Sequence, residues 1–117
     1  RLGNTAQARG STAWAGNFGL SQVIAFPNPA TTMTKIRCAF TGAGAAQISG
    51  KVTITDGSGD TVVILPLQGT GGGMYDAIWN LRNRDGSLAA NGIYFAEVEA
   101  FGPGGEMKER RKLAVLR

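Results

Sequence analysis

Short runs of alternating apolar and polar residues, separated by glycine- and proline-rich turns, limit what this chain can fold into more than any other feature. In the clearest run, "MTKIRCAFT", the side chains on one face are those of Thr34, Ile36, Cys38 and Phe40. Alternation with a period of two is typical of a β-strand that buries one face. Turn signals recur about every ten residues, as in small antiparallel sandwiches. The pattern predicts an all-β fold, an antiparallel immunoglobulin-like β-sandwich that is about seven-stranded.

The other strands are predicted from similar runs. We expect "SGKVTITD" and "MYDAIWN" to be strands, with inward-facing Val52, Ile54, Tyr75, Ala77 and Trp79. "SQVIAF", "TVVILPL" and the hairpin of "GIYFAEVEAF" with "KERRKLAVL" complete the set, and Pro66 favours a sheet edge for "TVVILPL". "QGTGGG" is expected to be a loop and "GAGAAQ" a flexible link. "LAA" at 88–90 is the only helix-like stretch, and it is too short to stand alone.

Length and composition indicate a single domain. The chain has 117 residues, 18 of them glycine, which is enough for one modest core. We expect residues 1–22 to be a linker or a loosely ordered segment, although Trp14 and Phe18 leave open an added strand there. Residues 23–117 are expected to form the sandwich. No apolar run approaches the roughly 18 residues of a membrane span, and no signal-peptide core is visible. We therefore expect no direct insertion into a membrane. The linker-like residues 1–22 lead us to expect a piece of a longer protein.

The residue types exclude much enzyme chemistry. The chain has no histidine and one cysteine, so Cys–His and Ser–His pairs, histidine-based zinc sites and an internal disulfide are ruled out. Cys38 lies between apolar neighbours and is interpreted as a small buried hydrophobe. A formal charge of +4 is too mild to indicate nucleic acid. The sequence predicts no enzyme, no cofactor and no metal site.

Two loop motifs resemble ligand sites but are better explained as turns. "DGSGD" spaces Asp56, Ser58 and Asp60 like the start of a calcium loop, but the position that needs an acidic ligand holds Leu67. We therefore predict a turn, with Gly59 at its bend. "GTGGG" is not followed by Lys-Ser/Thr or by a helical pattern, so a phosphate loop is not predicted.

The stretch "WNLRNRDGSLAANGIYF" is predicted to be a corner between two strands. Trp79 should end a strand and plug the core; an exposed ligand platform is the alternative. Asp85 and Gly86 supply a turn, and Asn91 with Gly92 starts the next strand, where Tyr94 is a second anchor.

The same stretch resembles the signature W-D-G-R-(N/D)-x-x-G-x-x-(V/L)-A-S-G-x-Y-(F/Y) of a bacterial family. That family covers the immunoglobulin-like domain of the flagellar hook-capping protein and the C-terminal sorting domains of type IX secretion cargo. "FPNPATTMTKIRCAF", "KVTITDGSGDTVVIL" and "KERRKLAVLR" resemble its other motifs in the same order. The family-signature residues are Pro27, Asn28, Pro29, Asp56, Gly59, Trp79, Arg82, Gly86, Gly92 and Tyr94. The chain departs from the pattern at Asn80-Leu81, where the family has Asp-Gly, and at Thr55, where it commonly has Tyr.

The resemblance implies a non-catalytic, extracytoplasmic module at the end of a longer secreted protein. An outer-membrane export machine would read such a module as a sorting and anchoring signal. The alternative is a structural or assembly module, such as a flagellar-cap-like or stalk domain, that contacts a surface or periplasmic protein. The fold by itself does not decide between the two.

Any recognition is expected to involve the terminal strand. Lys108, Arg110 and Lys112 share one of its faces and could dock an anionic partner. The alternative is a solvated face, balanced by Glu97 and Glu99 on the adjoining strand, that guards a sheet edge. The predicted recognition residues are Lys108, Arg110, Lys112, Leu113, Val115 and Arg117.

Overall fold

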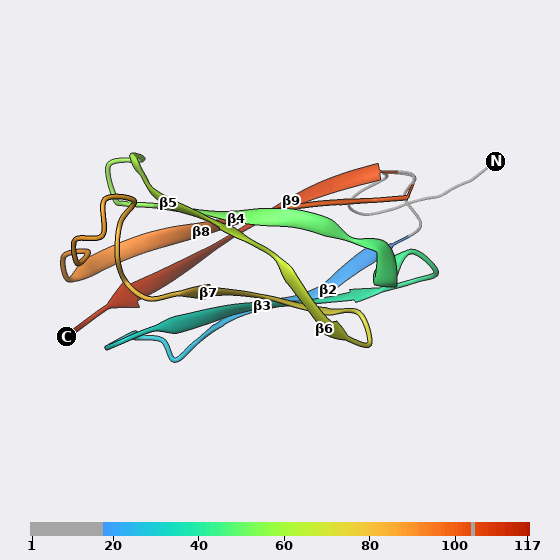
Figure 1. The fold of residues 1–117 in the computed structure, drawn as a ribbon, viewed down its shortest axis with the longest axis horizontal. Coiled ribbons are helices and arrows are strands. Elements are labelled where there is room, and N and C mark those ends of the chain that lie inside the picture. Colours follow the sequence, from blue (N-terminus) through green and yellow to red (C-terminus); the bar gives the residue numbers. More distant parts are fainter. Residues whose placement is uncertain (1–17, 104) are drawn as a thin grey trace.

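The computed structural model describes residues 18–103 and 105–117, and this range folds into two packed β-sheets (Figure 1). Each sheet is antiparallel and four-stranded, with the strand orders β2-β3-β7-β6 and β5-β4-β8-β9. The described strands are β2 (Gly19–Phe26), β3 (Thr34–Thr41), β4 (Ser49–Thr55), β5 (Thr61–Pro66), β6 (Gln68–Gly71), β7 (Met74–Trp79), β8 (Gly92–Gly102) and β9 (Gly105–Val115).

The strand order is that of an immunoglobulin-like sandwich. Lettered along the chain from β2 as A, the first sheet reads A-B-E-D and the second reads C′-C-F-G. The predicted sandwich is therefore confirmed, with eight described strands in place of about seven. The additional strand is β6, in the stretch that we expected to be a loop. Its four residues are all exposed, so no apolar side chain marks it in the sequence.

The predicted inward faces are correct. Along β3 the side chains alternate between buried and partly exposed, and Thr34, Ile36 and Cys38 are fully buried. Val52 and Ile54 of β4 are also fully buried. Pro66 ends β5, which is an edge strand as expected. Sheet-on-sheet packing of these apolar faces supplies the main stabilisation of the fold.

Aromatic side chains fill both ends of the core. At one end Phe40 packs edge-on against Phe18 and Tyr75, with ring centroids 5.8 Å and 5.6 Å away. Tyr75 also donates a hydrogen bond to the Ala45 carbonyl and accepts one from the Ile48 amide. These bonds hold a short 3₁₀ helix, η2 (Ala45–Gln47), in the stretch predicted to be a flexible link. At the other end Trp79 packs against Tyr94, 5.2 Å away. Residues 88–90 form no helix.

The first described strand begins earlier than the predicted domain start at residue 23. β2 starts at Gly19, and Phe18 is buried in the core. Trp14 and most of the predicted N-terminal segment lie outside the described residues. Within the described residues, no helix has the length and apolar character that crossing a membrane requires.

Candidate functional site: the terminal strand and its clamp

Strand β9 has two halves with different surroundings. β8 pairs with it along its whole length, from Gly102–Gly105 to Gly92–Val115. In residues 105–112, the open half, no side chain is fully buried. In residues 113–117, the clamped half, Leu113 and Val115 are buried in the core. These two predicted recognition residues therefore stabilise the fold and offer a partner no surface, whereas Arg117 is exposed.

The outer face of the open half carries the predicted cations. Lys108 lies opposite Glu99 of β8, with its Nζ 3.6 Å from the carboxylate, and Lys51 of β4 approaches the same carboxylate at 3.7 Å. The Arg110 guanidinium lies over the Phe95 ring, 4.3 Å from its centroid. Because Glu99 is already shared by two lysines, the positive charge of this face is only partly neutralised. Arg110 and Lys112 also flank a shallow hollow beside Phe95.

The β2–β3 connection holds the clamped half from one side. The Asn28 side-chain oxygen accepts a hydrogen bond from the Ala114 amide at 3.0 Å. The Ala30 amide donates to the Ala114 carbonyl at 2.8 Å, and the Leu116 amide donates to the Ala30 carbonyl at 2.9 Å. Ala30 and Val115 thus form a parallel bridge. The peptide bonds before Pro27 and Pro29 are both cis. The start of the motif "FPNPATTMTKIRCAF" is therefore hydrogen-bonded directly to the terminal strand.

Asn91 holds the same half from the other side. Its side-chain oxygen accepts a hydrogen bond from the Arg117 amide at 3.0 Å, and its side-chain nitrogen donates to the Arg117 carbonyl at 3.3 Å. The side-chain amide thus pairs with Arg117 as a neighbouring strand residue would. Asn28, Ala30 and Asn91 together form what we call the clamp. Asn28 was predicted as a family-signature residue and Asn91 as a turn residue, and neither was predicted to contact the terminal strand.

The corner beneath the clamp has the predicted core plug. Trp79 is fully buried, and its indole nitrogen donates to the Arg82 carbonyl at 2.9 Å. The Tyr94 hydroxyl donates to the Ala90 carbonyl at 2.6 Å, as in the tyrosine corner of immunoglobulin-like domains. Burial raises the pKa of Tyr94, and the Asp56 carboxylate raises it further, so the phenol stays a neutral donor. The ligand-platform alternative for Trp79 is therefore excluded.

The loop after Trp79 contains one unusual backbone conformation. Leu81, which stands where the signature that the sequence resembles has glycine, has a φ of +63° and a fully buried side chain. A left-handed conformation favours glycine, so Leu81 combines backbone strain with apolar burial. Arg82 donates to the Gly86 carbonyl at 2.7 Å, and Gly86 has a φ of +90°. The Asp85 carboxylate accepts from the Ser87 side chain and amide, which lowers its pKa.

"DGSGD" is a turn, as predicted. One Asp56 carboxylate oxygen accepts hydrogen bonds from the Ser58 and Asp60 amides, at 2.9 Å and 3.0 Å. The Gly59 amide donates to the Asp56 carbonyl, and its φ of +89° suits the bend. In the part of the chain that the structure describes, no three His, Cys, Asp or Glu side chains cluster as metal ligands would.

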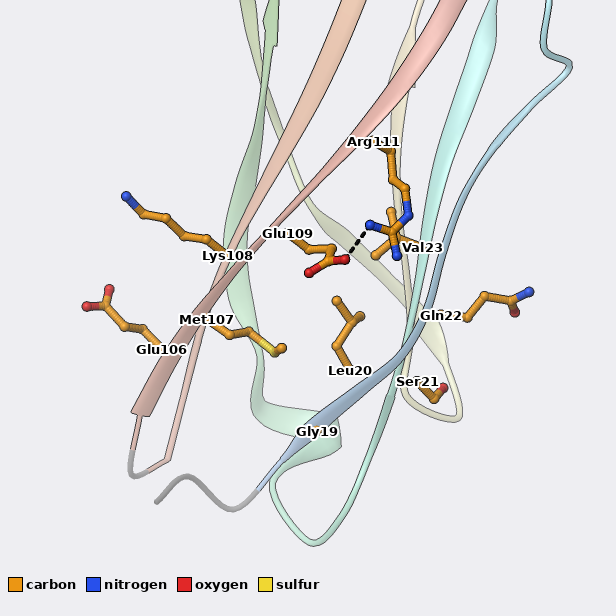
Figure 2. A pocket seen from close by; sticks show the side chains of 10 residues that line it. All are labelled: Gly19, Leu20, Ser21, Gln22, Val23, Glu106, Met107, Lys108, Glu109 and Arg111. Atoms are coloured by element: carbon orange, nitrogen blue, oxygen red, sulfur yellow. Dashed lines mark hydrogen bonds and ion pairs between the residues drawn. The ribbon is translucent and has the colours of Figure 1, made fainter. Parts of the chain in front are cut away.

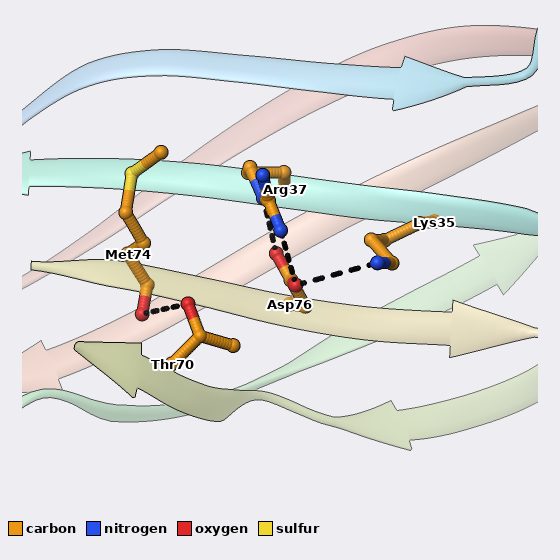
Figure 3. Close-up of polar contacts among 5 residues, drawn as sticks. All are labelled: Lys35, Arg37, Thr70, Met74 and Asp76. Atoms are coloured by element: carbon orange, nitrogen blue, oxygen red, sulfur yellow. Dashed lines mark hydrogen bonds and ion pairs between the residues drawn. The ribbon is translucent and has the colours of Figure 1, made fainter.

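An ion cluster lies on the outer face of the other sheet (Figure 3). Asp76 of β7 accepts two hydrogen bonds from Arg37 of β3, at 2.8 Å and 2.9 Å, and Lys35 lies 3.9 Å away. The bonds from Arg37 lower the pKa of Asp76, and the nearby charges lower it further against the effect of burial. Phe26 lies within 6 Å of both cations. Asp76 is therefore held as a carboxylate and has a structural role.

The thiol of Cys38 is unreactive at neutral pH. Cys38 is fully buried, and desolvation raises its pKa to about 12. At neutral pH it is a protonated, inaccessible thiol, which matches its predicted role as a small hydrophobe. Asp76 is paired with Arg37, and Asp56 and Asp85 accept hydrogen bonds within turns.

Comparison with known proteins supports the fold. No protein-family model and no curated protein matches the chain. Among solved structures, it is similar to a region of PorU from Porphyromonas gingivalis, seen in a crystal structure of dimeric latent PorU. The TM-score is 0.72 and the sequence identity is 23%, with 96% of this chain covered and 10% of the PorU chain. This chain therefore matches a sandwich that forms a small part of a much longer bacterial protein.

Proposed function

We propose that this chain is a non-catalytic sorting and anchoring module of a secreted bacterial protein, and that an outer-membrane export machine reads its strand β9. The proposal combines the resemblance to type IX sorting domains with one structural observation. Residues from separate family-like motifs converge on β9: Asn28 holds Ala114, Tyr94 pairs with Leu113, and Asn91 holds Arg117. The fold thus fixes the register of β9 and presents Lys108, Arg110 and Lys112 outward.

Deleting the end of β9 tests the proposal, but the deletion also affects the core. Deleting residues 108–117 is expected to leave the parent protein in the periplasm, and normal delivery of that truncation would contradict the proposal. The deletion also removes Leu113 and Val115 from the core, however, so retention by itself would not separate lost recognition from unfolding.

A sharper test changes only the exposed cations. In the full parent protein, Lys108→Gln, Arg110→Gln and Lys112→Gln together are expected to shift most of it from the cell surface to the periplasm. A control, Arg84→Gln, removes an exposed cation that lies outside both β9 and the Glu99 cluster, and it is expected to be delivered normally. Thermal melting of each purified domain checks that it is folded. Normal surface delivery of the folded triple variant would rule out reading through this face.

The alternative assembly role is favoured by a different surface. On the outer face of the β2-β3-β7-β6 sheet, Ile24, Phe26 and Ile78 are exposed by 38%, 39% and 56%. An apolar group of this kind is typical of a contact surface within an assembly. If this role holds, Ile78→Lys is expected to abolish self-association or partner binding and to leave export unchanged. Size-exclusion chromatography with light scattering, together with the delivery assay, separates the two roles.

A further inference from the structure

The two sheets do not close against each other along one side of the sandwich. There a groove of about 530 Å³ separates β2 from the open half of β9. Figure 2 shows that Leu20, Met107, Glu109 and Arg111 point into it, whereas Lys108 points away to the outer face. Leu20 and Met107 are partly exposed, and Val23 forms the buried wall. The floor is thus apolar, and the Glu109–Arg111 ion pair lies beside it.

The groove is bordered by two sheet edges. Among the described strands, the sheet neighbour of β9 is β8 and that of β2 is β3, and the bridge from Ala30 to Val115 lies beyond the open half of β9. In an antiparallel edge strand every second residue directs its N–H and C=O away from its neighbour, which makes the edge a template for another strand. Ala30 occupies this edge at Ala114 and Leu116, so among the described residues the stretch left for pairing is 106–112. Within it the Arg110 carbonyl accepts a hydrogen bond from the Arg111 side chain, which an added strand would replace.

The side chains of β9 define what an added strand would carry. Residues directly opposite each other on neighbouring strands come within about 5 Å, so their side chains interact on each face. On the outer face an added strand would meet Glu106 at one end and then Lys108, Arg110 and Lys112, and the three cations favour carboxylates. On the inner face it would lie over Leu20 and Met107, which favour apolar side chains, and beside Glu109 and Arg111, whose charges are already paired with each other. The matching sequence therefore alternates acidic and apolar residues.

Charge argues against two other occupants. In the antiparallel register centred on Arg110, a second copy of "KERRK" would place Arg110 against Arg110 and Lys108 against Lys112, and like charges directly opposite are destabilising. Residues 1–17 of this chain contain Arg1 and Arg9 and no acidic residue, so they lack the carboxylates that the outer face favours.

We propose that an extended segment of another protein, alternating acidic and apolar residues, adds to the sheet along the open edge of β9 and fills the groove. This inference rests on the proposed function, because it takes β9 as the recognised strand. It adds the chemistry of the segment of the partner protein that binds there. Main-chain hydrogen bonds supply affinity, and the two faces supply specificity.

The test uses the purified 117-residue chain and fluorescently labelled peptides of about ten residues, the length of a long strand. A Glu-Val alternating peptide is expected to bind, and fluorescence anisotropy measures its affinity. A Lys-Val alternating peptide and an acidic peptide with its valines grouped at one end are expected to bind at least about tenfold more weakly. Equal binding of the grouped peptide would show simple polyanion attraction and overturn the proposal.

Backbone methylation tests strand addition directly. Two Glu-Val peptides carry N-methyl groups at either the odd or the even positions. Only every second amide of an added strand faces β9, so one methylated peptide should bind and the other should not. Loss of binding by both peptides, or by neither, would rule out an edge-paired strand. Size-exclusion chromatography of the chain without peptide detects a second copy in the groove, and a dimer that peptide does not dissociate would also overturn the proposal.

Variants separate this proposal from the sorting function. The triple change of Lys108, Arg110 and Lys112 to Gln should weaken binding of the Glu-Val peptide by about tenfold or more, because it removes the opposing charges. The Arg84→Gln control should bind as the unmodified chain does. If the unmodified chain binds the peptide but the triple variant is exported normally, the sorting role is overturned and the strand site is kept. If the triple variant has an export defect but the unmodified chain binds no peptide, the strand site is overturned and the sorting role is kept.

Discussion

The two halves of β9 belong to one strand but are stabilised in different ways. The clamped half buries Leu113 and Val115 and is held by Asn28, Ala30 and Asn91. Among the described strands, the open half pairs with β8 on one edge and with no strand on the other, and its inner face meets a groove. The contrast shows that one strand can fasten a sandwich at one end and leave a pairing edge at the other. It also separates the residues that keep the fold from those free to contact a partner.

The largest expected difference is in the free energy of unfolding when one apolar side chain is truncated in each half. Leu113→Ala should lower the free energy of unfolding by about 2 to 5 kcal/mol, because it empties a fully buried site. Met107→Ala, on the same strand but beside the groove, should cost about 1 kcal/mol or less. Urea denaturation of both variants measures the difference. Equal losses would mean that the open half is as tightly packed as the clamped half.

The strained loop under the clamp gives the next largest effect. Leu81→Ala and Leu81→Gly both lose the buried side chain, but glycine relieves a left-handed conformation that costs about 1 to 2 kcal/mol. The glycine variant should therefore unfold at the same urea concentration as the alanine variant, or at a higher one. At Val98, buried in the middle of β8, glycine should instead be less stable than alanine by about 1 kcal/mol. The same order at both sites would contradict the assigned strain.

Removing one side of the clamp should have a smaller effect that is confined to one half. Asn28→Ala or Asn91→Ala should each lower stability by about 1 kcal/mol, the typical net value of such hydrogen bonds. Native-state hydrogen exchange should show faster exchange in residues 113–117 and unchanged exchange in residues 105–112. Gln47→Ala, on an exposed side chain of η2, is the control. Faster exchange throughout β9 would show that the two halves open together.

The ion cluster on the opposite sheet should stabilise both halves of β9 equally, and its contribution should depend on pH only in acid. Arg37 lowers the pKa of Asp76 below its ordinary 3.8. The resulting stabilisation is complete above that ordinary value and is lost as the pH falls through the lowered one. Asp76→Asn should therefore flatten the acid side of the stability curve, measured by urea midpoints between pH 2 and 7. Asp85→Asn tests whether the carboxylate of the loop, which is also lowered, contributes a separate acid dependence.

The sequence predicted those features that depend on side-chain periodicity. The inward faces of β3, β4 and β7 and the burial of Trp79 follow directly from the alternating pattern. β6 was missed because its pairing with β7 is made by backbone atoms of an exposed, glycine-rich stretch. There glycine permits close approach: a Cβ on Gly69 would lie 3.2 Å from the Tyr75 ring.

The candidate site was predicted only on its outer face. Lys108, Arg110 and Lys112 were recognised from alternation, but Leu113 and Val115 were grouped with them although they face the core. The clamp joins side-chain amides to backbone groups of residues far away in the chain, and no local pattern encodes such pairs. The groove likewise depends on two edge strands from different sheets, so it becomes visible only once the topology is known.

The bond between Asn28 and Ala114 joins positions 86 residues apart, which gives the sandwich a fixed order of completion. Whether the chain leaves the ribosome or threads through a pore from its N-terminal side, Asn28 arrives early and must wait for the last strand. Folds dominated by such distant contacts form slowly. Until β9 arrives, one edge of β8 stays unpaired and the core lacks Leu113 and Val115. An unfinished copy thus differs from a finished one in exposed apolar surface, a difference that a protease or chaperone detects without reading any sequence.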